Sequence, residues 1–157
     1  MTVHIWPFNW GWLNSKDMAG TMAKAIDNTG KYIDEHLKVA QKLGKPLVFE
    51  EFGLPRDGFV FTPGSPVTLR DQYYDFSFGR VLESTGKKGL LAGVNFWAFS
   101  GTGKPNAERT DNMWKTGDDY LGDPPQEAQG LNSVFNNDPT MKIVKKYNSQ
   151  INMSLKK

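Results

Sequence analysis

Apolar residues recur along this chain at two alternating spacings. Short, nearly continuous apolar runs predict buried strands, and longer stretches with an apolar residue every three or four positions predict helices with one apolar face. Gly44 ends the first helical stretch, and Asp138 followed by Pro139 predicts the N-cap and first position of the last helix. The predicted order is a strand at 3–6, a helix at 18–43, a strand at 46–52, a helix at 67–84, a strand at 90–99 and a helix from 138.

A repeated order of apolar strand and helix predicts an α/β fold in which helices cover a parallel sheet. Three such units leave two unpaired strand edges, which favour association unless something covers them. The chain also begins inside its first strand, and a complete (β/α)8 barrel typically needs about 250 residues. We therefore expect residues 1–157 to form a single partial catalytic domain, the C-terminal portion of a larger barrel. The long stretch 100–137 has few regular patterns and is predicted to be a loop.

Composition narrows the classes of partner. The 19 basic and 17 acidic side chains give a net charge of +2, which offers little for phosphate recognition, so we expect no nucleic acid partner. No apolar run approaches the ~20 residues that a membrane-spanning helix needs. The chain has no cysteine and two distant histidines, which excludes thiolate chemistry and a zinc cluster. Four aspartates at 111, 118, 119 and 123 lack calcium-loop spacing and are expected to be solvated, so we expect no metal or cofactor.

The adjacent carboxylates of Glu50 and Glu51 end the second predicted strand. Because side chains alternate along a strand, Leu47, Phe49 and Glu51 are expected on one face and Val48, Glu50 and Phe52 on the other. A carboxylate among aromatic neighbours is costly to bury unless it is paired or used in chemistry. A salt-bridged strand terminus is the alternative that the residues alone leave open.

Three ordered motifs and one longer stretch carry a family resemblance. HIWP with NWGW lies at residues 4–12, FEEFG at 49–53 and NFWAF at 95–99, and the segment from Trp114 to Phe135 follows. Together they cover nearly the whole chain. The chain resembles the C-terminal half of a glycoside hydrolase family 5 β-mannanase, which implies strands six to eight of a TIM (β/α)8 barrel.

The resemblance implies a retaining glycosidase and gives roles to several strand-end residues. Glu51 matches the nucleophile, and Trp97 matches the tryptophan beneath the reacting sugar. His4 and Trp6 would orient the substrate, while Trp10 and, more weakly, Trp114 would contact further sugar units. The expected partner is β-mannan or a related polysaccharide, the expected location is secreted or periplasmic, and no cofactor is implied.

A retaining glycosidase also needs a carboxylic acid that protonates the leaving oxygen. In the family that the chain resembles, this acid is a Glu in an Asn-Glu-Pro motif on an earlier strand. That motif is absent from these residues. We therefore expect the chain to be inactive alone and to require the N-terminal half of the barrel, or to self-associate.

Two alternatives stay open. The first is a half-barrel that binds polysaccharide or self-associates without cutting any bond. The second is cellulase or xylanase specificity on the same fold, although the segment after Trp114 favours mannan.

Overall fold

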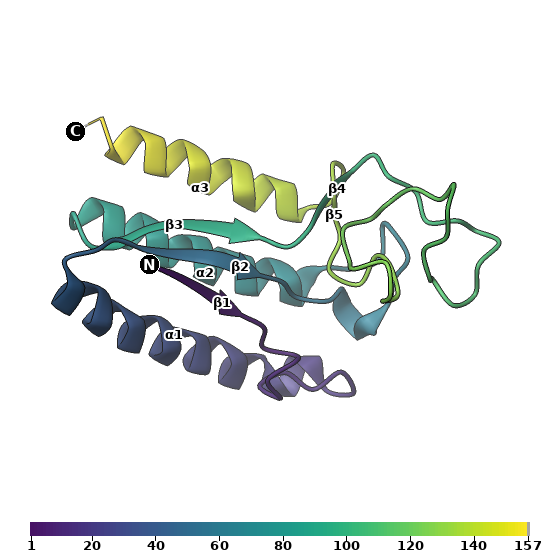
Figure 1. The fold of residues 1–157 in the computed structure, drawn as a ribbon, viewed down its shortest axis with the longest axis horizontal. Coiled ribbons are helices and arrows are strands. Elements are labelled where there is room, and N and C mark those ends of the chain that lie inside the picture. The colour runs from purple at the N-terminus through teal and green to yellow at the C-terminus, as the bar shows by residue number, and fades with distance from the viewer. Residues whose placement is uncertain (157) are drawn as a thin grey trace.

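The computed structural model describes residues 1–156, and Lys157 lies outside the described residues. The chain forms three β/α units with a long excursion before the last helix (Figure 1). The elements are β1 (Thr2–Ile5), α1 (Met18–Leu43), β2 (Leu47–Phe52), the 3-10 helix η1 (Asp57–Phe59), α2 (Thr68–Gly86), β3 (Leu91–Phe96), β4 (Phe99–Gly101), β5 (Val134–Phe135) and α3 (Thr140–Ser154).

The predicted parallel sheet is confirmed. Its strand order is β1-β2-β3, and both neighbouring pairs are parallel. All three strands therefore point their carboxyl ends the same way, and the long excursion between β3 and α3 lies beyond those ends (Figure 1). No helix among residues 1–156 is both long enough and apolar enough to cross a bilayer.

Helix α1 has the bounds that its apolar spacing predicts, because both ends carry specific caps. The Asp17 carboxylate accepts a hydrogen bond of 2.9 Å from the Gly20 amide at the N-terminus. Gly44 adopts the left-handed conformation, with φ of 60°, at the C-terminus. These caps satisfy main-chain groups that the helix itself leaves without partners.

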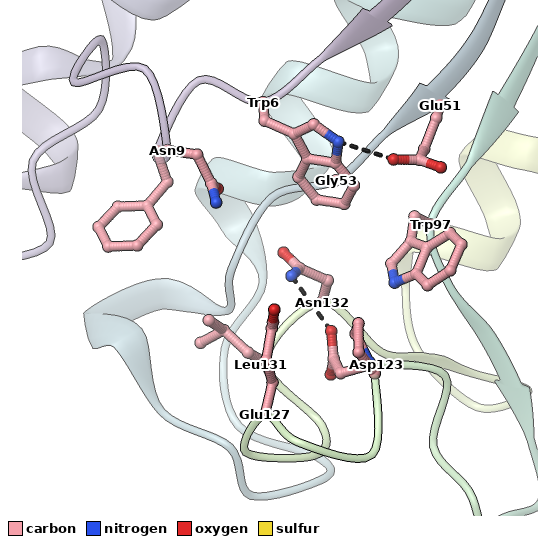
Figure 2. A pocket seen from close by; sticks show the side chains of 11 residues that line it. Trp6, Asn9, Glu51, Gly53, Trp97, Asp123, Glu127, Leu131 and Asn132 are labelled. Carbon is pink, nitrogen blue, oxygen red and sulfur yellow. Dashed lines mark hydrogen bonds between the residues drawn. The ribbon is translucent and has the colours of Figure 1, made fainter.

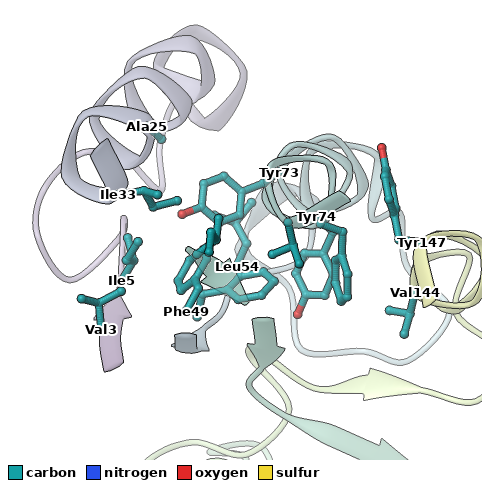
Figure 3. Packing of buried hydrophobic residues seen from close by; sticks show 14 of the residues in the cluster. Val3, Ile5, Ala25, Ile33, Phe49, Leu54, Tyr73, Tyr74, Val144 and Tyr147 are labelled. Atoms are coloured by element: carbon teal, nitrogen blue, oxygen red, sulfur yellow. The ribbon is translucent and has the colours of Figure 1, made fainter. Parts of the chain in front are cut away.

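The core lies between the sheet and the helices (Figure 3). Phe52 of β2 is fully buried against Tyr73 and Tyr74 of α2, with ring centroids 5.9 and 4.7 Å away. The hydroxyl groups of Tyr73 and Thr29 form a buried hydrogen bond of 2.7 Å that joins α2 to α1. Aromatic burial on one side of the sheet therefore fixes β2 against the helices, and the strand that bears Glu51 has a rigid base.

Simple alternation along β2 fails at its carboxyl end, and the expected face assignment is wrong there. Phe49 and Phe52 are both fully buried and in ring contact, with centroids 4.7 Å apart. The pairing register between β1 and β2 slips, since Val3 pairs with Phe49 but His4 pairs with Glu51. This irregularity is a β-bulge at Glu50, and it returns Phe52 to the core while turning Glu51 to the opposite face.

The long excursion is more regular than its composition predicts. Strands β4 and β5 form a small parallel sheet, with Phe99 paired to Val134. The predicted capping role of Asp138 is wrong, because α3 begins at Thr140 and the Asp138 carboxylate binds the buried Arg56 guanidinium instead. A buried carboxylate gains more from this ion pair than from exposed main-chain amides.

Candidate active site

A cavity of about 330 Å³ opens at the carboxyl ends of β1 and β2, where catalytic residues of α/β barrels lie (Figure 2). Its walls come from the strand ends and from the long excursion. The lining residues are Trp6, Phe8, Asn9, Glu51, Gly53, Trp97, Asp123, Pro124, Glu127, Leu131 and Asn132.

Glu51 is held in this cavity by Trp6. The indole Nε1–H of Trp6 donates a hydrogen bond of 2.8 Å to Oε1 of Glu51 (Figure 2). The Trp6 ring can lie against β2 because residue 53 is glycine: a Cβ there would be 2.6 Å from Cζ3 of Trp6 and 2.9 Å from the Trp97 carbonyl oxygen. One carboxylate oxygen is thereby fixed by a donor from the neighbouring strand's loop.

Trp97 completes the aromatic wall of the cavity. Its ring centroid lies 6.5 Å from that of Trp6, and the two planes meet at 73°. The indole is half-buried, so its side chain keeps accessible surface in the cavity opposite the excursion (Figure 2). A flat, partly exposed indole beside a carboxylate can hold the apolar face of a sugar ring.

His4 borders the site from β1 without lining the cavity itself. Its Nδ1 lies 3.5 Å from Oε1 of Glu51, and its Nε2 lies 3.6 Å from Oε2 of Glu50. Both carboxylates therefore face the same imidazole on the open side of the sheet. Glu50 is exposed and does not point into the helix layer.

Trp10 and Trp114 lie outside the cavity. Trp10 is 39% exposed and packs against Trp12 and Tyr32, with ring centroids 4.8 and 5.2 Å away, on the flank of α1. The Trp114 indole donates a hydrogen bond of 3.1 Å to the Asp118 carbonyl oxygen within the excursion. Of the six predicted site residues, the structure brings Glu51, Trp6, Trp97 and His4 together and leaves these two apart.

The excursion adds polar residues that sequence reasoning did not assign to the site. Asp123 is buried, which corrects its expected place among solvated loop charges, and burial raises the pKa of its carboxyl group above the ordinary value. It accepts hydrogen bonds from the Gly130 amide at 2.8 Å and from the Asn132 side chain at 3.3 Å. The resemblance through residues 122–130 was the available signal, but it gave no contact between this segment and Glu51.

Glu127 and Asn132 also reach the cavity from the excursion (Figure 2). The cavity thus has a carboxylate and two indoles on its strand side and polar side chains on the opposite side. Among residues 1–156, no three His, Asp or Glu side chains are arranged to hold a metal ion. Such a mixed lining suits a hydroxyl-rich ligand with an apolar ring face.

Comparison with known proteins gives a consistent result. A family described as glycoside hydrolase family 5 β-mannosidase-like matches residues 1–156. A family 5 mannosidase from Rhizomucor miehei superposes with a TM-score of 0.87 at 32% identity, over 99% of this chain and 38% of that chain. The same similarity holds for a Glu-to-Ala mutant of that enzyme in complex with mannosyl-fructose.

Two further proteins of lower sequence identity are also mannan hydrolases by name. Mannan endo-1,4-β-mannosidase 4 from Solanum lycopersicum is 29% identical over 103 residues, which cover 65% of this chain and 23% of that protein. An endo-β-1,4-mannanase from Thermotoga petrophila shares the fold, with a TM-score of 0.50 at 24% identity over 96% of this chain and 26% of that chain. The chain thus spans well under half the length of these relatives. Its three β/α units correspond to part of a TIM-barrel hydrolase, and the chain belongs to the β-mannosidase-like group of glycoside hydrolase family 5.

Proposed function

We propose that this chain carries the nucleophile half of a retaining β-mannan hydrolase, with Glu51 as the nucleophile. The observation that supports this most strongly is the position of Glu51. It is a carboxylate at the end of a parallel strand, it accepts a hydrogen bond from Trp6, and it faces a cavity that Trp97 also lines. The relatives named as mannosidases and mannanases supply the substrate class.

The proposed reaction has two displacements. A carboxylate oxygen of Glu51 attacks the anomeric carbon while the bond from that carbon to the glycosidic oxygen breaks, and a carboxylic acid protonates the departing oxygen. The carboxylate that the acid has become then takes a proton from water, and the oxygen of that water displaces Glu51 from the anomeric carbon. The configuration at that carbon is retained, and the nucleophile is regenerated.

Trp6 and His4 prepare the nucleophile. The Trp6 indole N–H donates a hydrogen bond to Oε1 of Glu51, which leaves Oε2 free to be the attacking oxygen. His4, whose Nδ1 is 3.5 Å from the same Oε1, limits the rotation of the carboxylate. Holding one oxygen fixes the direction of the other, and such preorganisation lowers the barrier.

Trp97 is the sugar platform of the proposed site. A mannose ring placed on its indole would lie beside Glu51, with its hydroxyl groups toward Asn132 and Glu127. Internal β-1,4 bonds of mannan or galactomannan are the proposed target. Trp10 and Trp114 would contact sugar units outside the cavity, in keeping with their separation from it. Secretion or periplasmic location fits a polymeric substrate of this kind.

The acid partner must lie about 5–5.5 Å from the nucleophile in a retaining enzyme. Glu50 faces His4, Asp123 is occupied by Gly130 and Asn132, and Glu127 enters from the excursion on the opposite side of the cavity, so we assign this role to none of the three. We therefore propose that β1, β2 and β3 are strands six to eight of a barrel within one catalytic domain. The acid would come from earlier β/α units, and the 157 residues alone would not hydrolyse mannan.

Two surfaces fit such a partner. Beside β1, the flank of α1 exposes Val39 and Leu43, at 45% and 59%. At the other end of the chain, Met153 near the end of α3 and Leu155 just after it are exposed, at 56% and 70%. Because β1 and β3 are the edges of the sheet, further β/α units would pair with both edges and bring their helices next to α1 and α3. The N-terminal half of the barrel fits this best, and a second copy of the chain is the alternative occupant.

The test uses the chain alone and a fusion that joins it to the preceding part of the Rhizomucor miehei enzyme. We expect the fusion to release reducing sugar from galactomannan, with the β-anomer formed first, and the chain alone to release none. Hydrolysis by the chain alone would refute the need for a partner. A folded fusion that binds but never cleaves mannan would refute the proposed reaction. Cleavage of cellulose or xylan in preference to mannan would refute the substrate.

A further inference from the structure

The guanidinium group of Arg70, in the first turn of α2, is fully buried directly behind the candidate site. It donates three hydrogen bonds, all to main-chain carbonyl oxygens: Nε to Leu54 at 2.8 Å, Nη1 to Ser133 at 2.8 Å and Nη2 to Leu131 at 3.0 Å. The nearest carboxylate oxygen of Asp138 is 3.9 Å from Nη1, so the charge is directed mainly at main-chain dipoles. Such a buried cation is costly unless its donors are satisfied.

One of the three acceptor residues lines the cavity, and the other two adjoin lining residues. Leu54 directly follows Gly53, which lines the cavity at the end of the Glu51 strand. Leu131 lines the opposite wall, and Ser133 directly follows Asn132, whose side chain reaches the cavity (Figure 2). One planar group therefore joins segments about 80 positions apart in the sequence at the points where each meets the proposed sugar site.

The shape of the guanidinium group makes this link specific. Its donors lie in a rigid plane and can hold three acceptors at once, whereas a lysine ammonium is a single point on a flexible stem. The side of the Asn132 wall that faces the cavity has a weaker tie, since the Asn132 amide donates to Asp123 at 3.3 Å. The wall is also held on the β3 side, where the Asn132 carbonyl oxygen accepts a hydrogen bond of 3.3 Å from the Ala98 amide. Arg70 is the group that ties it to Leu54, at the end of the Glu51 strand.

Arg56 offers a matched comparison. It is also fully buried, and its guanidinium group also makes three hydrogen bonds, two to the Asp138 carboxylate and one of 2.9 Å to the Ser65 carbonyl oxygen. Neither Asp138 nor Ser65 lines the cavity or adjoins a residue that does. Arg56 therefore supports the fold without holding a wall of the site.

We propose that Arg70 is a positioning residue that fixes the Leu131–Asn132 wall against the end of the Glu51 strand and thereby sets the affinity of the site for mannosyl units. This inference rests on the proposed function for its ligand, but not for the geometry. A change at Arg70 is transmitted to the sugar through the main chain, since Arg70 itself does not line the cavity.

The test compares Arg70→Lys with Arg56→Lys in the full chain. Each variant loses part of a buried hydrogen-bond set, so both are expected to lose stability toward urea. Mannotriose is then titrated while the indole and side-chain amide resonances are followed. We expect Arg70→Lys to weaken mannotriose binding about tenfold, as expected for the loss of one to two hydrogen bonds at the wall, and Arg56→Lys to change it less than twofold.

A second readout needs no ligand. Arg70→Lys should shift the Asn132 side-chain amide and the Gly53 amide resonances, and Arg56→Lys should leave both in place. If Arg70→Lys does not fold, Arg70→Gln replaces it, because glutamine removes the buried charge and keeps two donors. Should both variants be unfolded, the wild-type chain is used. Its Arg70 Nε–H resonance should shift on addition of mannotriose, and an unmoved resonance would overturn the inference.

The possible failures are distinguishable. Wild-type chain that binds no mannotriose, while Arg70→Lys still shifts Asn132 and Gly53, would refute the proposed ligand and keep the wall-positioning role. If Arg70→Lys binds mannotriose as tightly as the wild-type chain does, the inference is refuted and the proposed function stands. Equal weakening by Arg70→Lys and Arg56→Lys would make Arg70 an ordinary structural residue and would also overturn it.

Discussion

The indole of Trp6 donates a 2.8 Å hydrogen bond to the carboxylate of Glu51, across the boundary between β1 and β2. This contact exists because three local features agree. The β-bulge turns Glu51 out of the helix-facing layer, Gly53 leaves room for the Trp6 ring, and the parallel pairing of His4 with Glu51 aligns the two strand ends. The proposed nucleophile is thus positioned by main-chain geometry as much as by its own side chain.

Replacing the proposed nucleophile should abolish turnover. In the fusion protein, Glu51→Gln keeps the size of the side chain and removes the attacking oxygen, so we expect kcat on galactomannan to fall by roughly 10⁴-fold or more. Glu50→Gln, next to it on the same strand, is the control and should lose less than about tenfold. Comparable losses in the two variants would contradict the assignment of Glu51.

The contribution of the Trp6 donor can be isolated from its ring. Trp6→Phe retains an aromatic ring near Gly53 but removes the N–H that binds Glu51. Hydrogen bonds to charged groups contribute about 1.5–3 kcal/mol, so kcat should fall about 10- to 100-fold with a smaller change in KM. Steady-state kinetics of the fusion would measure both. Trp12→Phe, outside the cavity, should leave kcat unchanged, and an equal effect there would contradict a specific role for Trp6.

The close approach at Gly53 predicts a steric effect. An alanine Cβ would lie 2.6 Å from the Trp6 ring, so Gly53→Ala should displace that ring and destabilise the chain by roughly 1–3 kcal/mol. Gly93→Ala on β3 is the control, because its Cβ would meet only Val48, at an ordinary 3.8 Å. Urea unfolding gives the free energies, and the Trp6 indole resonance reports the displacement. Equal stability and an unmoved resonance in Gly53→Ala would show that the packing around Trp6 adjusts freely.

Acid should loosen the excursion at Asp118. Hydrogen bonds from Arg109 and Asn106 lower the pKa of the Asp118 carboxyl from 3.8 to about 2. A depressed folded-state pKa means that this stabilisation is present above about pH 4 and is lost as the pH falls toward 2. The Trp114 indole N–H, bound to the Asp118 carbonyl oxygen, should shift over that interval.

The control for this pH dependence is Asp118→Asn, in which no carboxyl group titrates at that position. The acid-induced shift of the Trp114 resonance should be absent in this variant. If the variant shows the same transition as the wild-type chain, another group causes it and the assignment to Asp118 is wrong.

Regular periodicity made most of the fold predictable. Helix α1 has the predicted bounds because its apolar spacing, the Asp17 cap and the left-handed Gly44 all act within a few residues of each other. The parallel order of the strands followed from the repeated strand and helix pattern. The bulge at Glu50 was not predictable in this way, since it arises from the pairing of two strands and leaves no mark in the alternation of a single one.

Some residues of the candidate site could be predicted from the sequence and others could not. Glu51, Trp6 and Trp97 could be found because each stands at a strand end within a short motif. Asn132 could not, because its place depends on long-range hydrogen bonds: Arg70, 62 positions earlier in the printed sequence, donates to the carbonyl oxygens on either side of it, and the Ala98 amide donates to its own. Trp10 also stands in a short motif, but its place on the flank of α1 depends on packing against Tyr32, which the motif does not reveal.

Covalent trapping tests the central claim most directly. The fusion protein would be incubated with a 2-deoxy-2-fluoro-mannosyl fluoride, which forms the glycosyl-enzyme and slows its hydrolysis, and the labelled peptide would be identified by mass spectrometry. The account predicts a single fluoromannosyl group on Glu51, absent from Glu51→Gln. A label on Glu50 or Glu127, or steady mannan hydrolysis by Glu51→Gln, would contradict it.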